Sequence, residues 1–201
     1  NVPRICFINK LDRTGASFER SYASILKRLS PNAVRVQLPI GEESNHEGIV
    51  DLMKMKAYYF DGEMGQNVRE EEIPENLKAD AEKYRSEMIE KISENNEDML
   101  DRYLEGSEFS TEELVAGLRK AVLANAIFPV MCGSALKNKG VQLVLDGVVD
   151  YLPSPIDLPA VKGLDPKTDE EVVREPSDDA PFAALAFKLQ NDPYVGSLTF
   201  F

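Results

Sequence analysis

The chain has 201 residues, of which 35 are Asp or Glu and 23 are Lys or Arg, so its formal charge is −12. This acidic excess argues against a general nucleic-acid-binding protein, because such proteins use Lys and Arg to displace phosphate counterions. The hydrophobic content of 43% is enough to build a core, which excludes an intrinsically disordered chain. The charge is unevenly placed. Residues 61–115 hold 18 acids and 6 bases, a net of −12, and the remainder is neutral.

No run of about 18 apolar residues is present and no signal-peptide pattern opens the chain, so we expect a cytoplasmic protein without a membrane span. Cys6 and Cys132 lie in apolar segments, and we expect both to be reduced thiols in the core. They lack zinc-site spacing, and no metal ligands are expected. The chain opens in a strand-like segment without Met and stops in another, which suggests part of a longer protein.

A strand, a polar loop and a helix are predicted at the start. Residues 4–8 form a short continuous apolar run, typical of a strand buried on both faces of a parallel sheet. Apolar side chains then recur at helical spacing over residues 18–29, and Ser30-Pro31-Asn32 ends that helix.

Residues 33–73 change to short segments typical of a small antiparallel sheet. Residues 34–38 alternate between apolar and polar side chains, which predicts a half-buried strand. Two further strands are expected near residues 49–52 and 55–59. His46 is the single histidine and lies in a polar segment, so we expect a surface position without a catalytic role.

Three helices are predicted next. A long amphipathic helix begins near Pro74 and continues to Ile92, with an outer face rich in Glu. A second helix ends at Gly106, and Ser110-Thr111-Glu112-Glu113 forms a capping box that opens the third. By base rate such an acidic helix face is simply solvated.

After Asn125 the opening pattern returns. Residues 127–132 are an apolar strand, a polar loop follows, and an apolar stripe from Val141 to Leu152 predicts a helix. An α/β domain is therefore predicted over residues 1–29 and 125–157, split by an α+β insert with acidic helices at residues 30–124.

The remaining residues are expected to connect to another domain. The proline-rich residues 153–181 indicate an extended linker, and residues 182–189 alternate like a strand. A turn at residues 192–196 precedes another strand. Residues 158–201 are accordingly predicted to be a linker and the start of a β-domain.

Asn9-Lys10-Leu11-Asp12 follows the first strand, at the edge where doubly wound sheets bind ligands. The Asp12 carboxylate can accept hydrogen bonds from guanine N1–H and its exocyclic amine. Adenine has an acceptor at N1 and no amine at C2, so it would leave this carboxylate partly unpaired. The Lys10 stem can lie along the base plane, and Asn9 can tie neighbouring loops together.

Gly133-Ser134-Ala135 occupies the equivalent position after the later strand and precedes a helix. A backbone N–H of this loop can donate to guanine O6. Two such loops in this order favour guanine recognition over a chance match to a four-residue motif.

Several segments in one order resemble the elongation factor G family of translational GTPases. The similar segments are residues 9–18, 132–142, 150–155, 182–188 and 192–196, with residues 30–124 in the place of the family's insert. The resemblance implies an α/β fold: a partial doubly wound P-loop GTPase domain, interrupted by an α+β insert and followed by the first strands of a β-barrel domain.

The resemblance also implies a function and a set of site residues. The whole protein would be a ribosome-dependent GTP hydrolase that drives translocation in the elongation step of protein synthesis. The residues that would contact the guanine of GTP or GDP are Asn9, Lys10, Asp12, Ser134, Ala135 and Leu136. The acidic insert would bind a ribosomal stalk protein, and for that contact we expect Glu82, Glu87, Glu90 and Glu94.

No Gly-x-x-x-x-Gly-Lys-Ser/Thr segment occurs in these 201 residues. Phosphate positioning and electrostatics supply nearly all catalysis in this enzyme class. Neither a catalytic residue nor a ligand of Mg²⁺, the ion implied for the whole protein, is therefore expected here. We expect this chain to lack GTPase activity and to bind guanine nucleotides weakly.

Alternatives to an elongation factor G remain. One is a non-catalytic acidic docking module that binds a stalk protein. The others are a related ribosome-protection, peptide-release or organellar GTPase. Neither membrane binding nor sequence-specific DNA binding is expected.

Overall fold

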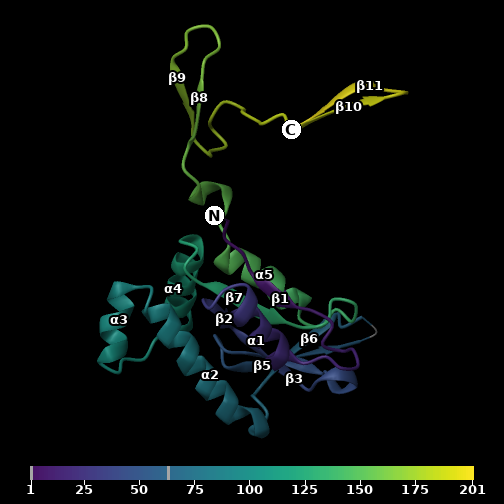
Figure 1. Cartoon of the computed structure of the whole chain (residues 1–201), viewed down its shortest axis with the longest axis vertical. Coiled ribbons are helices and arrows are strands. Elements are labelled where there is room, and N and C mark those ends of the chain that lie inside the picture. The colour runs from purple at the N-terminus through teal and green to yellow at the C-terminus, as the bar shows by residue number, and fades with distance from the viewer. Residues whose placement is uncertain (1, 63) are drawn as a thin grey trace. The chain divides into compact units, whose positions relative to one another are not determined.

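The computed structural model of the chain describes residues 2–62 and 64–201, which fall into two compact units (Figure 1). Unit 1 is Asn1–Leu152 and unit 2 is Pro153–Phe201. Among the described residues, the buried apolar core belongs wholly to unit 1. Over the same residues, no helix combines the length and the hydropathy needed to cross a membrane.

Unit 1 begins and ends with strands that are followed by helices. The residues between these two parts form an antiparallel sheet and three further helices. Its elements are β1 (Cys6–Ile8), α1 (Phe18–Arg28), β2 (Ala33–Arg35), β3 (Gln37–Ile40), the 3-10 helix η1 (Glu43–Asn45), β4 (Gly48–Asp51), β5 (Lys56–Asp61), β6 (Asn67–Glu71), α2 (Glu75–Ser93), α3 (Glu97–Leu104), α4 (Thr111–Leu123), β7 (Phe128–Cys132) and α5 (Val141–Tyr151).

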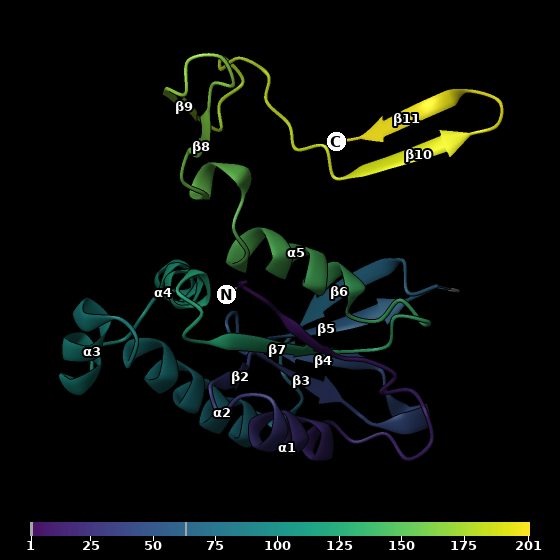
Figure 2. The same cartoon turned by 45° about the horizontal axis from the view of Figure 1, so that its top comes forward.

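A parallel sheet in the order β1-β7-β2 joins the two ends of unit 1. Its register pairs Phe7 with Met131 and Val34 with Pro129. Figure 2 shows α5 on one face of this sheet, with α1 and α2 on the other. The parallel sheet expected from the first apolar run is therefore confirmed. Its strands β1 and β7 are neighbours, so the loops that follow them emerge at the same edge of the sheet.

The prediction of one half-buried strand over residues 34–38 is wrong. The segment divides at Val36, whose N–H donates to the carbonyl of Val130 at 3.1 Å. Before it β2 joins the parallel sheet, and after it β3 joins an antiparallel one. The polar alternation was misleading because Arg35 is buried, with its guanidinium 4.1 Å from the ring centroid of Tyr22 and 3.9 Å from that of Tyr84.

The predicted antiparallel sheet has four strands in the order β3-β4-β5-β6. The three helices form as expected. α2 buries Ala81, Met88 and Ile92, and it packs against both α3 and α4. The capping box is confirmed: Ser110 Oγ accepts from the N–H of Glu113 at 3.2 Å, and Glu113 Oε2 accepts from the N–H of Ser110 at 2.8 Å.

Helix α5 buries a different face from the predicted stripe. Leu143, Gly147 and Tyr151 are its buried residues. Leu145 and Val149 of the stripe are 62% and 76% exposed. The helix is apolar around most of its circumference, so the spacing of apolar residues could not identify its inner face.

Unit 2 differs from the predicted linker and strand. Residues 153–181 contain the 3-10 helix η2 (Pro155–Asp157) and a hairpin of β8 (Val161–Leu164) and β9 (Glu171–Arg174). The strand expected from Phe182 begins only at Lys188, in the hairpin of β10 (Lys188–Asp192) and β11 (Gly196–Phe200). Each hairpin is a separate two-stranded sheet, and the start of a β-barrel domain and the four domain boundaries stay predictions.

Candidate functional site

Two loops lie side by side at the carboxyl ends of adjacent parallel strands. The first loop, residues 9–15, follows β1, and the second loop, residues 133–140, follows β7. The N–H of Leu11 donates to the carbonyl of Gly133 at 3.2 Å, and the N–H of Gly133 donates to that of Ile8 at 3.1 Å. Leu11 is 1% exposed and anchors the first loop in the core. The main chains of both loops are thus fixed to one another.

The side chain of Asn9 ties the two loops together. Its Oδ1 accepts from the N–H of Ala135 at 2.9 Å and from the N–H of Lys10 at 2.7 Å. Asn9 belongs to the first loop and Ala135 to the second, so this single oxygen spans both. The tying role expected for Asn9 is therefore seen in the structure.

Lys10 and Asp12 present charge at the end of the sheet. Lys10 is exposed and has a left-handed backbone with φ 65°. Asp12 is partly exposed, and a hydrogen bond from the side chain of Ser134 holds the pKa of its carboxyl below the usual value. The positive charges of Arg13 and Lys137 act in the same direction. Asp12 is therefore an ionised acceptor oriented by the second loop.

The second loop is closed by a pair of main-chain hydrogen bonds. The N–H of Ser134 donates to the carbonyl of Lys139, and the N–H of Lys139 donates to that of Ser134, both at 2.9 Å. Ser134 is fully buried, whereas Ala135 and Leu136 are exposed. Because the N–H groups of Ser134 and Ala135 already donate within the loops, the N–H of Leu136 is the one of these three without a partner among the described residues.

A third segment, for which the sequence predicts no site, contacts the first loop. This segment, Glu42–His46, is called the clamp turn below and includes η1. The N–H of Glu43 donates to the carbonyl of Leu11 at 2.8 Å, and Glu43 Oε1 accepts from the N–H of Gly15 at 2.8 Å. No local pattern could reveal this contact, since Gly15 and Glu43 are 28 residues apart.

The surface position expected for His46 is wrong. His46 is 2% exposed, and its Nδ1 lies 3.4 Å from the carbonyl oxygen of Gly41. Burial lowers the pKa of the imidazole, which favours the neutral ring. The polar neighbours of His46 misled the prediction, because the whole turn folds back against the loops and Lys139 Nζ donates to the carbonyl of His46 at 2.6 Å.

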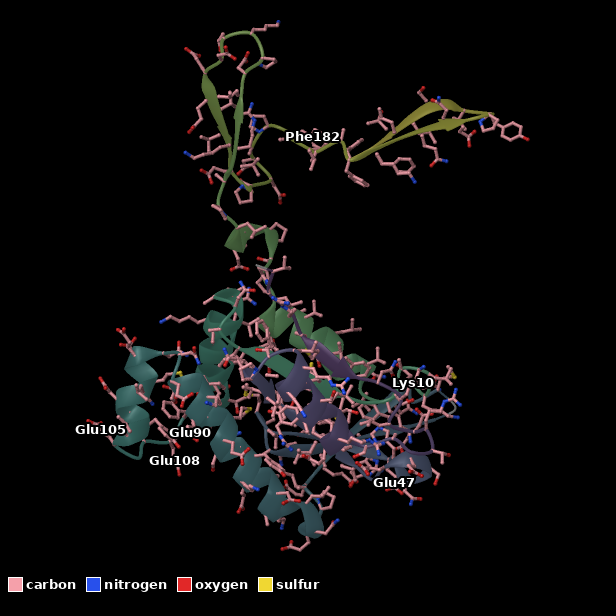
Figure 3. All side chains as sticks on the ribbon, viewed as in Figure 1. Lys10, Glu47, Glu90, Glu105, Glu108 and Phe182 are labelled. Carbon is pink, nitrogen blue, oxygen red and sulfur yellow. The ribbon has the colours of Figure 1, made fainter. Side chains whose placement is uncertain are left out.

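The residues predicted to dock a partner lie on the outer face of α2 and at its C-cap, Glu94. Glu82, Glu87, Glu90 and Glu94, called the acidic face below, are all exposed. Glu94 pairs with Lys91 at 2.7 Å, while the other three form no ion pair with any described residue. Figure 3 shows Glu90 with Glu105 and Glu108 at one end of unit 1, and Lys10 with Glu47 at the other. The acidic face and the two loops are therefore separate sites.

A cavity of about 300 Å³ separates part of the acidic face from α1 and β2. Its lining includes Glu87 and Glu90 from α2, Tyr22 from α1 and Arg35 from β2. Arg35 also pairs with Glu19 of α1, so one buried cation joins these three elements.

Other reactive groups lie apart from these loops. Burial raises the pKa of both thiols, Cys6 and Cys132, and neither forms a disulfide. Within residues 2–62 and 64–201, no group of three or more His, Cys, Asp or Glu side chains is arranged to hold a metal ion. None of the described residues is therefore assigned to Mg²⁺. The two loops offer an anionic acceptor and a free N–H, which suit the polar edges of a planar base.

Comparison with known proteins identifies a family. The family described as the elongation factor Tu GTP-binding domain matches residues 1–154. A crystal structure of a protein from Thermus thermophilus is similar to 98% of the chain, with a TM-score of 0.75 and 26% sequence identity. The chain spans 26% of the length of that protein.

Proposed function

Because the chain belongs to the family of the elongation factor Tu GTP-binding domain, a family of translational GTPases, we propose that its two loops bind the guanine base of GTP or GDP. One observation carries this proposal: Asn9 Oδ1 accepts from the N–H of Ala135 and so joins the loops at adjacent strand ends. Asp12 of the first loop supplies an anionic acceptor, and Leu136 of the second loop supplies an N–H without a partner among the described residues.

The proposed contacts follow from the polar edges of guanine. The ionised Asp12 carboxylate accepts from N1–H and from the exocyclic amine, and the N–H of Leu136 donates to O6. Lys10 covers the base plane with its methylene stem. Adenine reverses the polarity at both edges, and it would leave a charged acceptor without its donors.

We further propose that the whole protein is an elongation factor G, a GTPase that drives ribosomal translocation. The segments similar to that family and the position of residues 30–124 support this choice over a ribosome-protection, peptide-release or organellar relative. These 201 residues hold no phosphate-binding Gly-x-x-x-x-Gly-Lys-Ser/Thr segment. We therefore assign base recognition alone to them and expect no GTP hydrolysis from this chain, with phosphate and Mg²⁺ bound by other residues.

A nucleoside titration tests base recognition. Amide resonances of the ¹⁵N-labelled chain, above all those of Asp12, Ala135 and Leu136, should shift with guanosine and stay fixed with adenosine. Inosine lacks the exocyclic amine. Since a hydrogen bond to a charged group contributes about 1.5 kcal/mol or more, guanosine should bind about tenfold more tightly than inosine.

Substitution of Asp12 makes this test specific. Asp12→Asn should weaken guanosine binding and remove most of the preference over inosine, because one carbonyl replaces two anionic acceptors. Asp101→Asn makes the same change of charge at an exposed position of α3 and should alter neither value. Equal shifts with adenosine, or an unchanged preference in Asp12→Asn, would refute guanine recognition.

We also propose that the acidic face binds a basic surface of a ribosomal stalk protein. Three observations support a docking role: the four Glu side chains are exposed, three have no ion pair among the described residues, and their helix is anchored by a buried face. Such clustered charge would accelerate encounter with a basic partner. A non-catalytic docking module is the second candidate function because of these features.

Charge reversal tests docking. Glu87→Lys combined with Glu90→Lys should slow association with the stalk protein in stopped-flow measurements and reduce the salt dependence of the rate. Asp178→Lys combined with Asp179→Lys changes the net charge equally in unit 2 and should leave the rate nearly unchanged. If both double variants associate like the wild type, the acidic face is not the docking surface.

A further inference from the structure

We propose that the clamp turn, Glu42–His46, positions both guanine-binding loops and so sets the affinity for the base. The inference rests on the proposed function above, and it assigns a positioning role to residues that are distant in sequence from the motif that they support. The turn contacts no base itself. It acts through hydrogen bonds to the first loop, to the start of α1 and to the second loop.

Glu43 holds the first loop at two points. Its N–H donates to the carbonyl of Leu11 at 2.8 Å, and its Oε1 accepts from the N–H of Gly15 at 2.8 Å. Leu11 and Gly15 lie on either side of Asp12, so these contacts fix the backbone before and after the proposed base acceptor. A carboxylate that accepts from a backbone N–H makes a stronger bond than a neutral group does.

Glu42 holds the start of α1, just after the first loop. Its Oε1 accepts from the N–H of Phe18 at 3.1 Å, at the first residue of α1. An anion is favoured there, because the first N–H groups of a helix have no partner within the helix and the dipole is positive. Phe18 is 1% exposed, so the loop is fixed between a buried side chain and the clamp turn.

The second loop is held from the other end of the turn. Lys139 Nζ donates to the carbonyl of His46 at 2.6 Å, and the main chain of Lys139 pairs with Ser134. Ser134 in turn donates to Asp12. A five-residue turn therefore reaches both sides of the proposed base site.

The orientation of Asp12 explains why positioning matters for affinity. The Asp12 carboxylate must meet two donors on one edge of the base. If its backbone can rotate or shift, only a fraction of the molecules hold the geometry that binds, and the affinity for the base falls accordingly. The clamp turn removes that freedom before the base arrives. It belongs to residues 30–124, so the predicted insert would contribute to base recognition indirectly, through the loops that it positions.

Three variants separate positioning from general stability. Glu43→Met keeps the size of the side chain and removes the acceptor for Gly15, so guanosine should bind five- to tenfold more weakly in the amide-shift titration. Glu43→Gln keeps a carbonyl acceptor and should restore affinity to within about twofold. Glu47→Met, at an exposed neighbouring position, is the matched control and should bind like the wild type. Urea unfolding of each variant establishes that it is folded.

The outcomes distinguish this inference from the proposed function. If the wild type binds guanosine and Glu43→Met binds it equally well, the positioning role is overturned while base recognition stands. If the wild type shows no preference for guanosine, base recognition fails, and the positioning role fails with it. Should Glu43→Met not fold, Lys139→Met decides the question: a loss of threefold or more supports positioning, and wild-type affinity overturns it.

Discussion

Replacement of Gly133 by Ala should be the most damaging single-methyl change in the second loop. Gly133 has φ 155°, a backbone region that L side chains rarely adopt. A Cβ at this position would lie 2.2 Å from the carbonyl oxygen of Lys139. That oxygen belongs to the main chain and accepts from the N–H of Ser134, so it cannot move without opening the loop.

The expected cost combines backbone strain with lost hydrogen bonds. An unfavourable backbone conformation costs about 1–3 kcal/mol. Relief of the 2.2 Å contact breaks the two bonds between Ser134 and Lys139, at about 1 kcal/mol each. The free energy of unfolding should therefore fall by about 3–5 kcal/mol, a large part of the stability of a typical domain.

Gly15→Ala is the matched control. Gly15 also has a positive φ, 79°, but a Cβ there would meet no atom within 4 Å. Its substitution should cost only the conformational term, about 1–2 kcal/mol. Both variants place a methyl group on a backbone with positive φ, and the Gly133 variant adds the contact with the main chain of Lys139.

Urea unfolding followed by circular dichroism at 222 nm provides the assay, because the α-helices of the described residues all lie in unit 1. With a slope of about 2 kcal/mol/M, the midpoint should fall by about 1.5–2.5 M in Gly133→Ala and by about 0.5–1 M in Gly15→Ala. Equal midpoints for the two variants would refute the steric reasoning.

Two further predictions concern pH. Ser134→Ala removes the hydrogen bond that lowers the pKa of Asp12, so the carboxyl of the variant should protonate at a higher pH than that of the wild type. On acidification the variant should therefore lose guanosine binding at a higher pH. Identical pH profiles of binding for variant and wild type would contradict this. Burial lowers the pKa of His46 in the folded state below the pKa of about 6.5 that it has in the unfolded chain. As the pH falls from about 6.5 toward the folded pKa, the unfolded chain takes up a proton that the folded chain does not, so the stability that the neutral ring allows above pH 6.5 is lost. The urea midpoint of the wild type should therefore drop between pH 7 and 5 more than that of His46→Gln, and parallel curves would show that His46 does not titrate in this way.

The sequence predicted the positions of the two loops because a general rule applies to them. A continuous apolar run indicated a buried strand at residues 4–8 and again at 127–132, and ligands bind at the carboxyl ends of parallel strands. The carboxamide of Asn9 could be assigned a tying role from its chemistry alone. Its partner is the N–H of Ala135, 126 residues away, which only the fold supplies.

Residues whose environment depends on distant partners could not be predicted. Arg35 is a charged residue in an alternating segment, and it is buried because Tyr22 and Tyr84 cover its guanidinium. His46 has polar neighbours, and it is buried because the clamp turn packs against the two loops. In both cases the sequence identified a polar side chain correctly. The error was to equate polarity with exposure to solvent.

Arg35 also has a consequence for how unit 1 opens. Its guanidinium contacts Tyr22 of α1 and Tyr84 of α2, while its own backbone pairs with β7. Elements that share one buried cation lose it together, because exposure of any one of them leaves the charge without its partners. The amides of α1, β2 and α2 should consequently exchange their hydrogens in a single cooperative step. Slow exchange in β2, at the edge of the parallel sheet, would then be accompanied by slow exchange in α2, the helix that carries the acidic face.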